Sequence, residues 1–195
     1  MSIVLQGSTS GSITLQEPAV AGSTVLSLPA TSGTLITTGS TGQVIPKAAL
    51  PTGSVLQVVQ ASITGDFSTS SSTYVHATNH SLSITTEAAN SKILLMCNTP
   101  IQVDTGDRAQ TTFRYSVDSY ANNFGQTVII NEAAVDGGWM QTTPLHYLHS
   151  PNQAAGTAMT YRVYIRRASG NSTVYYPDAW GYTDEYSFIA MKIAA

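Results

Sequence analysis

Histidines and aspartates are the residues of this chain that could hold a metal, and their spacing argues against such a site. His146 and His149 lie three residues apart in a run that reads as a β-strand, where successive side chains point to opposite faces. Their imidazoles are therefore expected on opposite faces, whereas zinc needs convergent ligands. Asp104 and Asp107 supply two carboxylates where calcium takes about six to eight oxygens. We expect a turn at 104–107 and no metal site.

Hydrolytic chemistry also lacks its residue patterns. Serine is abundant, but no serine lies in the Gly-x-Ser-x-Gly sequence of a nucleophile elbow, and no helix is expected to complete one. Asp184 and Glu185 are neighbours in a turn rather than opposed carboxylates of the kind that cleave a glycosidic bond. The sequence therefore predicts no enzymatic activity and no cofactor.

Aromatic residues gather beside Asp and Asn in three connections, 118–124, 136–140 and 175–186. Aromatic rings next to carboxylates and amides suit neutral sugars or another protein surface. The same residues could instead plug the ends of a β-sandwich or stack about a subunit axis, and both interpretations stay open. The candidate receptor or interface residues are Tyr120, Phe124, Trp139, Tyr176, Trp180, Tyr182 and Tyr186.

The elements that must position these loops are short strands with period-two alternation, separated by Gly, Ser and Asn turns. Only 46–50 and 87–91 could hold a helical turn, and His76 and His80 flank a turn expected at 77–79. This pattern predicts an all-β fold, a jelly-roll-like antiparallel β-sandwich. The expected strands are 54–62, 73–77, 81–86, 92–99, 109–117, 126–132, 143–149, 158–167, 173–176 and 186–193.

The strand expected at 158–167 has two chemically different faces. Tyr161, Val163 and Ile165 are expected to face the core, so Arg162, Tyr164 and Arg166 face outward. An outward Arg/Tyr face is either a subunit interface or an ordinary wet face of strand-forming residues, and the sequence favours neither. In the last strand, Ile189, Met191 and Ile193 point one way and Phe188, Ala190 and Lys192 point the other.

The first fifty residues form a separate arm. Gly11, Gly22 and Gly33 recur at an even spacing, and each opens a short run of β-branched and Ser/Thr residues. Strands this short are marginal alone, so we expect the arm to be ordered by pairing with other copies or a partner. We predict an arm at 1–50, a linker at about 40–53 and a sandwich at 54–195. The candidate attachment residues are Ile13, Leu15, Val25, Leu26, Leu28, Leu35 and Ile36.

Composition narrows the class of protein. Charged residues are only 10% of the chain and the formal net charge is −3, which predicts no nucleic-acid binding. Cys97 stands alone in an apolar run, where a buried, inert thiol is expected. There is no apolar stretch long enough to span a membrane and no secretion signal, so we expect a protein made in the cytoplasm that leaves the cell within an assembly.

The arm segments 11–18 and 25–38 resemble the N-terminal segment of virion appendage proteins of tailed bacteriophages, notably those of cyanobacteria and marine bacteria. Four further runs, 53–60, 91–94, 160–163 and 189–193, resemble the C-terminal jelly-roll module of the same proteins. The resemblance spans nearly the whole chain. It implies a non-enzymatic homotrimer, assembled in the host cytoplasm, whose arm anchors to other virion proteins of the baseplate, tail or capsid.

Within that resemblance two roles in the virion remain. The first is a short tail fibre whose C-terminal knob contacts the host, in which case a host surface glycan is an expected partner. The alternative is a capsid decoration protein, either cement or head fibre, that stabilises the phage head. Extended collagen-like or coiled-coil repeats are missing from the sequence, which keeps decoration open. A third hypothesis is a bacterial carbohydrate-binding module, which would fold as an armless monomer.

Overall fold

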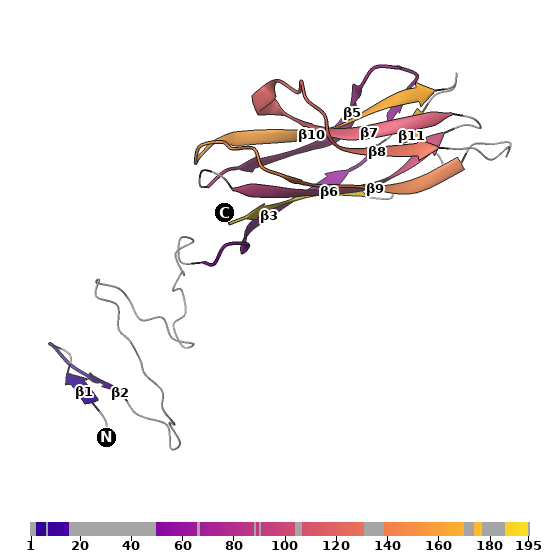
Figure 1. Cartoon of the computed structure of the whole chain (residues 1–195). Helices are drawn as coiled ribbons and strands as arrows, with labels where there is room; N and C mark the ends of the chain where they lie inside the picture. The colour runs from indigo at the N-terminus through magenta and orange to yellow at the C-terminus, as the bar shows by residue number, and fades with distance from the viewer. Residues whose placement is uncertain are drawn as a thin grey trace. The chain divides into compact units, whose positions relative to one another are not determined.

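The computed structural model describes residues 3–6, 8–15, 50–65, 67–87, 89, 91–103, 107–130, 139–169, 174–176 and 186–194. The chain divides into two compact units, 1–44 and 45–195. The first unit contains an antiparallel hairpin of β1 (Ile3–Gln6) and β2 (Ser12–Leu15), seen in Figure 1. Strand β2 coincides with the first run expected in the arm, whereas β1 lies where no strand is expected.

The described residues of the second unit form ten strands and one short 3-10 turn, η2 (Ser116–Asp118). The strands are β3 (Val55–Ile63), β4 (Phe67–Thr69), β5 (Val75–Thr85), β6 (Lys92–Val103), β7 (Arg108–Tyr115), β8 (Phe124–Ile130), β9 (Trp139–His149), β10 (Ala158–Ser169), β11 (Val174–Tyr176) and β12 (Tyr186–Ile193).

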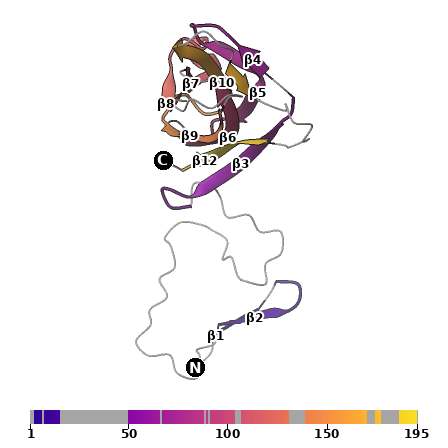
Figure 2. The same ribbon diagram turned by 90° about the vertical axis from the view of Figure 1, so that its right-hand side faces the viewer.

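Two antiparallel sheets face each other. One has the order β5-β10-β7-β8. The other has β3-β12-β6 with β9 on the far side of β6; the short strand β11 pairs farther along β6, and β4 pairs with β11. Figure 2 looks nearly along the strands and shows β8 beside β9 at one edge. Strand orders β3-β12-β6-β9 and β5-β10-β7-β8 are those of a jelly roll, two interlocked Greek keys. The predicted fold class is confirmed.

The core lies between the sheets and follows the alternation expected from the sequence. Tyr161, Val163 and Ile165 of β10 are at most 1% exposed. In β12 the inward set is Phe188, Ala190 and Lys192, and the ring of Phe188 stacks on Phe113 of β7 with centroids 5.4 Å apart. Each large apolar side chain buried here stabilises the fold by roughly 1.5–3 kcal/mol.

Three local expectations are wrong. The turn expected at 77–79 is a bulge within one continuous strand, since β10 pairs Arg162 with Ser81 and Tyr164 with His76. Asn79 absorbs the bulge with a φ of 68°, and an asparagine tolerates that left-handed conformation. The strand expected at 109–117 ends at Tyr115, where η2 begins. Trp139, expected in a loop, is the first residue of β9.

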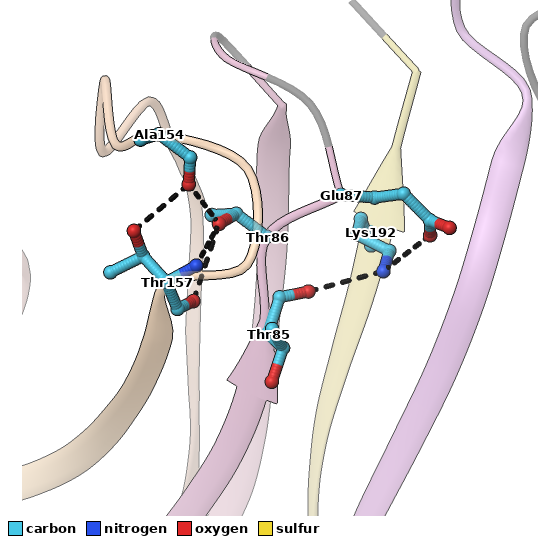
Figure 3. A network of polar contacts seen from close by, with 6 residues as sticks. All are labelled: Thr85, Thr86, Glu87, Ala154, Thr157 and Lys192. Carbon is cyan, nitrogen blue, oxygen red and sulfur yellow. Dashed lines mark hydrogen bonds and ion pairs between the residues drawn. The ribbon is translucent and has the colours of Figure 1, made fainter.

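A polar network closes one end of the sandwich (Figure 3). The ammonium of Lys192 in β12 donates to the backbone oxygen of Thr85 in β5 and pairs with the carboxylate of Glu87. Beside it, the Thr86 hydroxyl donates to the carbonyls of Ala154 and Thr157, and the amide of Thr157 donates back to that hydroxyl. The β9–β10 connection is therefore fixed to the end of β5.

Candidate functional site

The seven aromatic residues predicted as candidates lie at the ends of strands, in the turn after η2 or outside the described residues. Tyr120 follows η2, while Phe124 and Tyr186 begin β8 and β12. Trp139 and Tyr176 occupy strand positions, but only their backbones are described. Trp180 and Tyr182 lie outside the described residues, as do Asp104, Asp184 and Glu185.

Phe124 packs into the sandwich. Its ring stacks on His149 with centroids 4.5 Å apart and contacts Tyr115 and Phe113. His149 in turn forms a 2.9 Å hydrogen bond with the hydroxyl of Tyr161. Tyr186 is half-buried and also packs against the core. These two residues therefore fit the interpretation in which aromatic side chains plug the sandwich.

Tyr120 is different, because it faces away from this cluster and is held in a strained backbone. Ser119 and Tyr120 have φ angles of 57° and 60°, so two consecutive residues other than glycine are left-handed. A bulky residue in that region is a conformational outlier that costs about 1–3 kcal/mol. The turn places the ring of Tyr120 4.2 Å from the guanidinium carbon of Arg162.

Tyr120 belongs to a larger group of side chains on the outer face of the β5-β10-β7-β8 sheet. We call this group the arginine–tyrosine surface. Its members are Tyr74, Arg114, Tyr120, Arg162, Tyr164 and Arg166. Alternation predicts the outward positions of Arg162, Tyr164 and Arg166. It does not predict their partners, which are Arg114 on β7, Tyr74 just before β5 and Tyr120 after η2.

The arginines and tyrosines alternate in space. Arg114 lies over two rings, those of Tyr164 at 4.5 Å and Tyr74 at 5.3 Å. Arg166 lies over the same Tyr74 ring at 4.8 Å. Such contacts stabilise a structure by roughly 0.5–1 kcal/mol each at exposed sites. Thr112, directly opposite Tyr164 on the outer side of β7, is fully buried, so this layer covers the sheet beneath it.

Hydrogen bonds hold two of the three guanidinium groups. Arg166 donates twice to the amide oxygen of Gln110, at 2.8 and 2.6 Å. Arg114 donates to the side chain of Asn123 at 2.6 Å and to the backbone oxygen of Tyr120 at 3.0 Å. Within the described part of the chain, no carboxylate pairs with either group.

Arg162 has the least satisfied side chain of the three. Its Nε is buried and has no hydrogen-bond partner among the described residues. It lies directly opposite Arg114 in the β7/β10 register, so two like charges face each other across adjacent strands. Like charges in that position repel. The carboxylate nearest to Tyr120 in sequence, Asp118, accepts hydrogen bonds from Asn122 instead.

His76 extends the same surface onto β5. Its ring lies 5.7 Å from that of Tyr164, and its Nε2 is 3.2 Å from the hydroxyl of Ser81. Burial, and then the positive charge of Arg162, lower the pKa of His76 below its ordinary value. The imidazole is therefore neutral at pH 7, and the positive charge of the surface comes from its arginines.

Part of the outer face of the opposite sheet is apolar, beside a neighbouring row that also holds Gln60 and His146. Backbone register aligns one residue from each of four strands in a single row, Val58, Met191, Leu94 and Leu148. Val58 is 56% exposed and Leu148 is 47% exposed. Ile189, Met96 and Ile193 adjoin the row and are only partly buried. We call these residues the apolar face.

The hairpin of the first unit also presents apolar side chains to solvent. Val4 and Leu5 of β1 are 54% and 55% exposed, and as consecutive strand residues they point to opposite sides. The register places Ile13 opposite Leu5 and Leu15 opposite Ile3. The other predicted attachment residues, Val25, Leu26, Leu28, Leu35 and Ile36, lie outside the described residues.

Residues considered for metal or redox chemistry are dispersed. His146 lies on the outer face, bonded to Asn98, whereas His149 points inward to Tyr161, as their spacing predicts. In the described residues no three His, Cys, Asp or Glu side chains converge as metal ligands. Cys97 is buried, and burial raises the pKa of its thiol to about 12. No helix in the described ranges is long and apolar enough to cross a membrane.

Comparison with known proteins gives a distant similarity in fold. Neither a protein-family model nor a curated protein sequence matches the chain. A structure of T=1 particles derived from infectious bursal virus aligns with 80% of this chain and 41% of its own, at 14% identity and a TM-score of 0.41. The VP2 subviral particle of infectious bursal disease virus aligns with 71% of this chain and 37% of its own, at 13% identity and a TM-score of 0.35. The chain thus spans less than half the length of these proteins, and so distant a similarity does not specify its function.

Proposed function

We propose that this chain is a non-enzymatic structural protein of a tailed bacteriophage particle. In this proposal it is a short homotrimeric tail fibre that is assembled in the host cytoplasm, with residues 1–50 as the attachment arm and 54–195 as a knob that contacts the host surface. The observation that carries the assembly role is the apolar face, a row of four apolar residues across one sheet with its two outer members about half exposed.

An apolar sheet face of this kind is costly in water unless another surface covers it. Monomeric proteins rarely expose contiguous apolar patches larger than roughly a few hundred Å², and larger patches mark sites of association. We assign the apolar face to contacts between copies of this chain, because a closed symmetric oligomer buries the same patch of every subunit. Val4 and Leu5 of the arm supply a second exposed apolar element, which we assign to virion attachment.

Two further observations support a structural role in a virus particle rather than a catalytic role. The resemblance of the arm and of the later runs to phage appendage proteins spans nearly the whole sequence. The jelly roll is an architecture that recurs in capsid and lectin domains, where one rigid sandwich presents loops and edges to partners. Fold alone assigns no function, so this support is an analogy.

Capsid decoration is the second candidate, and the absence of shaft-like repeats from the sequence keeps it open. A cement protein would use the same apolar face against capsid subunits instead of its own copies. Copy number separates the two roles. Each role also needs the arm, so a truncated chain lacking residues 1–50 should fail to join the particle in both.

The test is quantitative mass spectrometry of this chain against the major capsid protein in purified phage particles. A few per cent relative to the capsid protein is expected for a fibre, while near-equal amounts mean decoration. Absence from the particle would refute the virion role in both forms. Incorporation of the arm-deleted chain at the normal level would contradict attachment through the arm.

A further inference from the structure

We propose that the arginine–tyrosine surface binds a carbohydrate that carries carboxylate groups, with Arg162 and Arg114 as the residues that contact the anion. The proposal deepens the host contact proposed above by naming its ligand class, and it rests on that function only for the source of the carbohydrate. Four observations carry it: the pairing of two arginines, the unsatisfied Arg162, the strained turn at Tyr120, and the neutral polar groups nearby.

The first observation is the direct opposition of Arg114 and Arg162 on adjacent strands. Stacking on tyrosine rings keeps the two guanidinium groups in place, but it does not cancel their mutual repulsion. In the described structure no carboxylate lies between them to do so. A bound anion would offset the repulsion, and the planar guanidinium fork matches a carboxylate with two parallel hydrogen bonds.

The second observation is the hydrogen-bonding state of Arg162. A guanidinium carries five N–H donors. Among the described residues none accepts a hydrogen bond from Arg162, and its Nε is buried without a partner. Buried donors are nearly always satisfied in proteins by a protein group or an ordered water, so this guanidinium keeps donors that a water or a bound acceptor can take up. Arg166, by contrast, already donates twice to Gln110 and is assigned a supporting role.

The third observation is the strained backbone that places the ring of Tyr120. Ser119 and Tyr120 are both left-handed, and the same turn lets the backbone oxygen of Tyr120 accept from Arg114 while its ring covers Arg162. One strained turn therefore orients both arginines. Strain of this kind persists where the surrounding structure requires the geometry, and it concentrates at binding sites.

The fourth observation selects a carbohydrate among anionic ligands. Ser83 and Thr160 share a 2.8 Å hydrogen bond at the exposed end of the surface, and the amides of Asn123 and Gln126 lie around its other members. Hydroxyl and amide groups pair with sugar hydroxyls. The chain as a whole carries a net charge of −3, which opposes the long-range attraction on which nucleic-acid binding depends.

The experiment measures binding of the full chain to three carboxylated oligosaccharides, hexagalacturonate, a hyaluronan hexasaccharide and sialyllactose, by titration calorimetry. Maltohexaose serves as the neutral probe and a short oligothymidylate as the phosphate probe. At least one carboxylated probe is expected to bind about tenfold or more tightly than maltohexaose, with an affinity that falls as salt rises. Binding of none of the three, or equal binding of the oligothymidylate, would overturn the proposal.

Variants assign the contact to residues. Arg162→Gln and Arg114→Gln each remove a charge with little change in volume, and each is expected to weaken binding about tenfold or more. Arg167→Gln is the matched control, an arginine of β10 outside the arginine–tyrosine surface, and should bind like the wild type. Far-UV circular dichroism and thermal melting check that the variants fold. If Arg167→Gln weakens binding equally, the ligand responds to the overall charge of the protein, and the assignment of the contact to Arg162 and Arg114 is wrong.

The same variants separate this proposal from a subunit interface on the arginine–tyrosine surface. Sedimentation velocity of Arg162→Gln should match the wild type, because the anion contact involves one subunit. A change in oligomeric state would assign the surface to subunit association and overturn the proposal. Failure of the virion test leaves these binding measurements unaffected, so the two proposals fail independently.

Discussion

The ammonium group of Lys192 lies 2.8 Å from Oε2 of Glu87, with the lysine only 4% exposed and the glutamate side chain 34% exposed. Removal of the glutamate charge leaves a buried cation with neutral acceptors, such as the Thr85 carbonyl, and no counter-charge among the described residues. We expect Glu87→Gln to lower the free energy of unfolding by about 1–3 kcal/mol. Lys192→Met should lower the free energy of unfolding by less, because the apolar methionine side chain can occupy the space of the buried lysine stem. Water solvates the exposed Glu87 carboxylate that remains. Urea unfolding measures both, and a larger loss in Lys192→Met would contradict this view.

The buried imidazole of His80 predicts acid sensitivity. Burial lowers its pKa to about 4, although its Nδ1 donates to the carbonyl of Thr78 at 2.9 Å. Between about pH 6.5 and pH 4 the unfolded chain therefore takes up a proton that the folded chain does not, and stability falls as pH falls. The loss is up to about 3 kcal/mol. His76 and His149, whose pKa values are also lowered by burial, act in the same direction.

Urea unfolding of the wild type and of His80→Asn, followed from about pH 7 to about pH 4, isolates the contribution of His80. The free energy of the variant should depend less on pH than that of the wild type across this window. Equal pH dependence in the two proteins would show that His80 does not cause the acid sensitivity.

Gly125 of β8 packs tightly against Tyr147 of β9. An added Cβ would lie 2.8 Å from the Cβ of Tyr147, and the φ of Gly125 is 62°. We expect Gly125→Ala to lower the free energy of unfolding by about 2–4 kcal/mol, through backbone strain and overpacking together. Gly156→Ala is the matched control, since its φ is 81° and nothing lies within 4 Å. If the two variants lose equal stability, the contact with Tyr147 contributes nothing.

The apolar face predicts that association stabilises the fold. Val58→Asp and Leu148→Asp introduce charges at positions that the monomer leaves about half exposed, so the isolated subunit should tolerate them. Both variants should sediment as smaller species, and their melting temperature should lose its dependence on protein concentration. Val117→Asp is the control, because Val117 is exposed on η2 and away from the apolar face. Unchanged sedimentation of both face variants would remove this face from the subunit contact.

The fold was accessible from the sequence because alternation marks which residues of a strand face the core. The pattern of β10 alone identified Tyr161, Val163 and Ile165 as buried and Arg162 and Arg166 as outward. Alternation does not detect irregular backbone. The sequence therefore predicted a turn at the bulge around Asn79 and two strands in place of the continuous strand β5. Alternation also does not say which strands are neighbours.

For that reason the arginine–tyrosine surface could be predicted only in part from the sequence. Arg114 and Arg162 are far apart in sequence and meet only through the pairing of β7 with β10. Tyr120 was a candidate as an aromatic loop residue, but its contact with Arg162 depends on a left-handed backbone that its residue type disfavours. Sequence signals of glycine or asparagine mark such turns, and neither occurs at positions 119 and 120.

Tyr120 therefore offers a test of strain against function. Tyr120→Gly removes the ring and relieves the left-handed backbone, whereas Tyr120→Ala removes the ring and keeps the strain. We expect the glycine variant to be more stable than the alanine variant by about 1 kcal/mol. Both should bind the carboxylated oligosaccharide more weakly than the wild type, since both lose the ring that orients Arg162. Tyr120→Phe keeps a ring over the guanidinium and should bind within about threefold of the wild type. Full binding by Tyr120→Gly would mean that the strained turn does not serve the site.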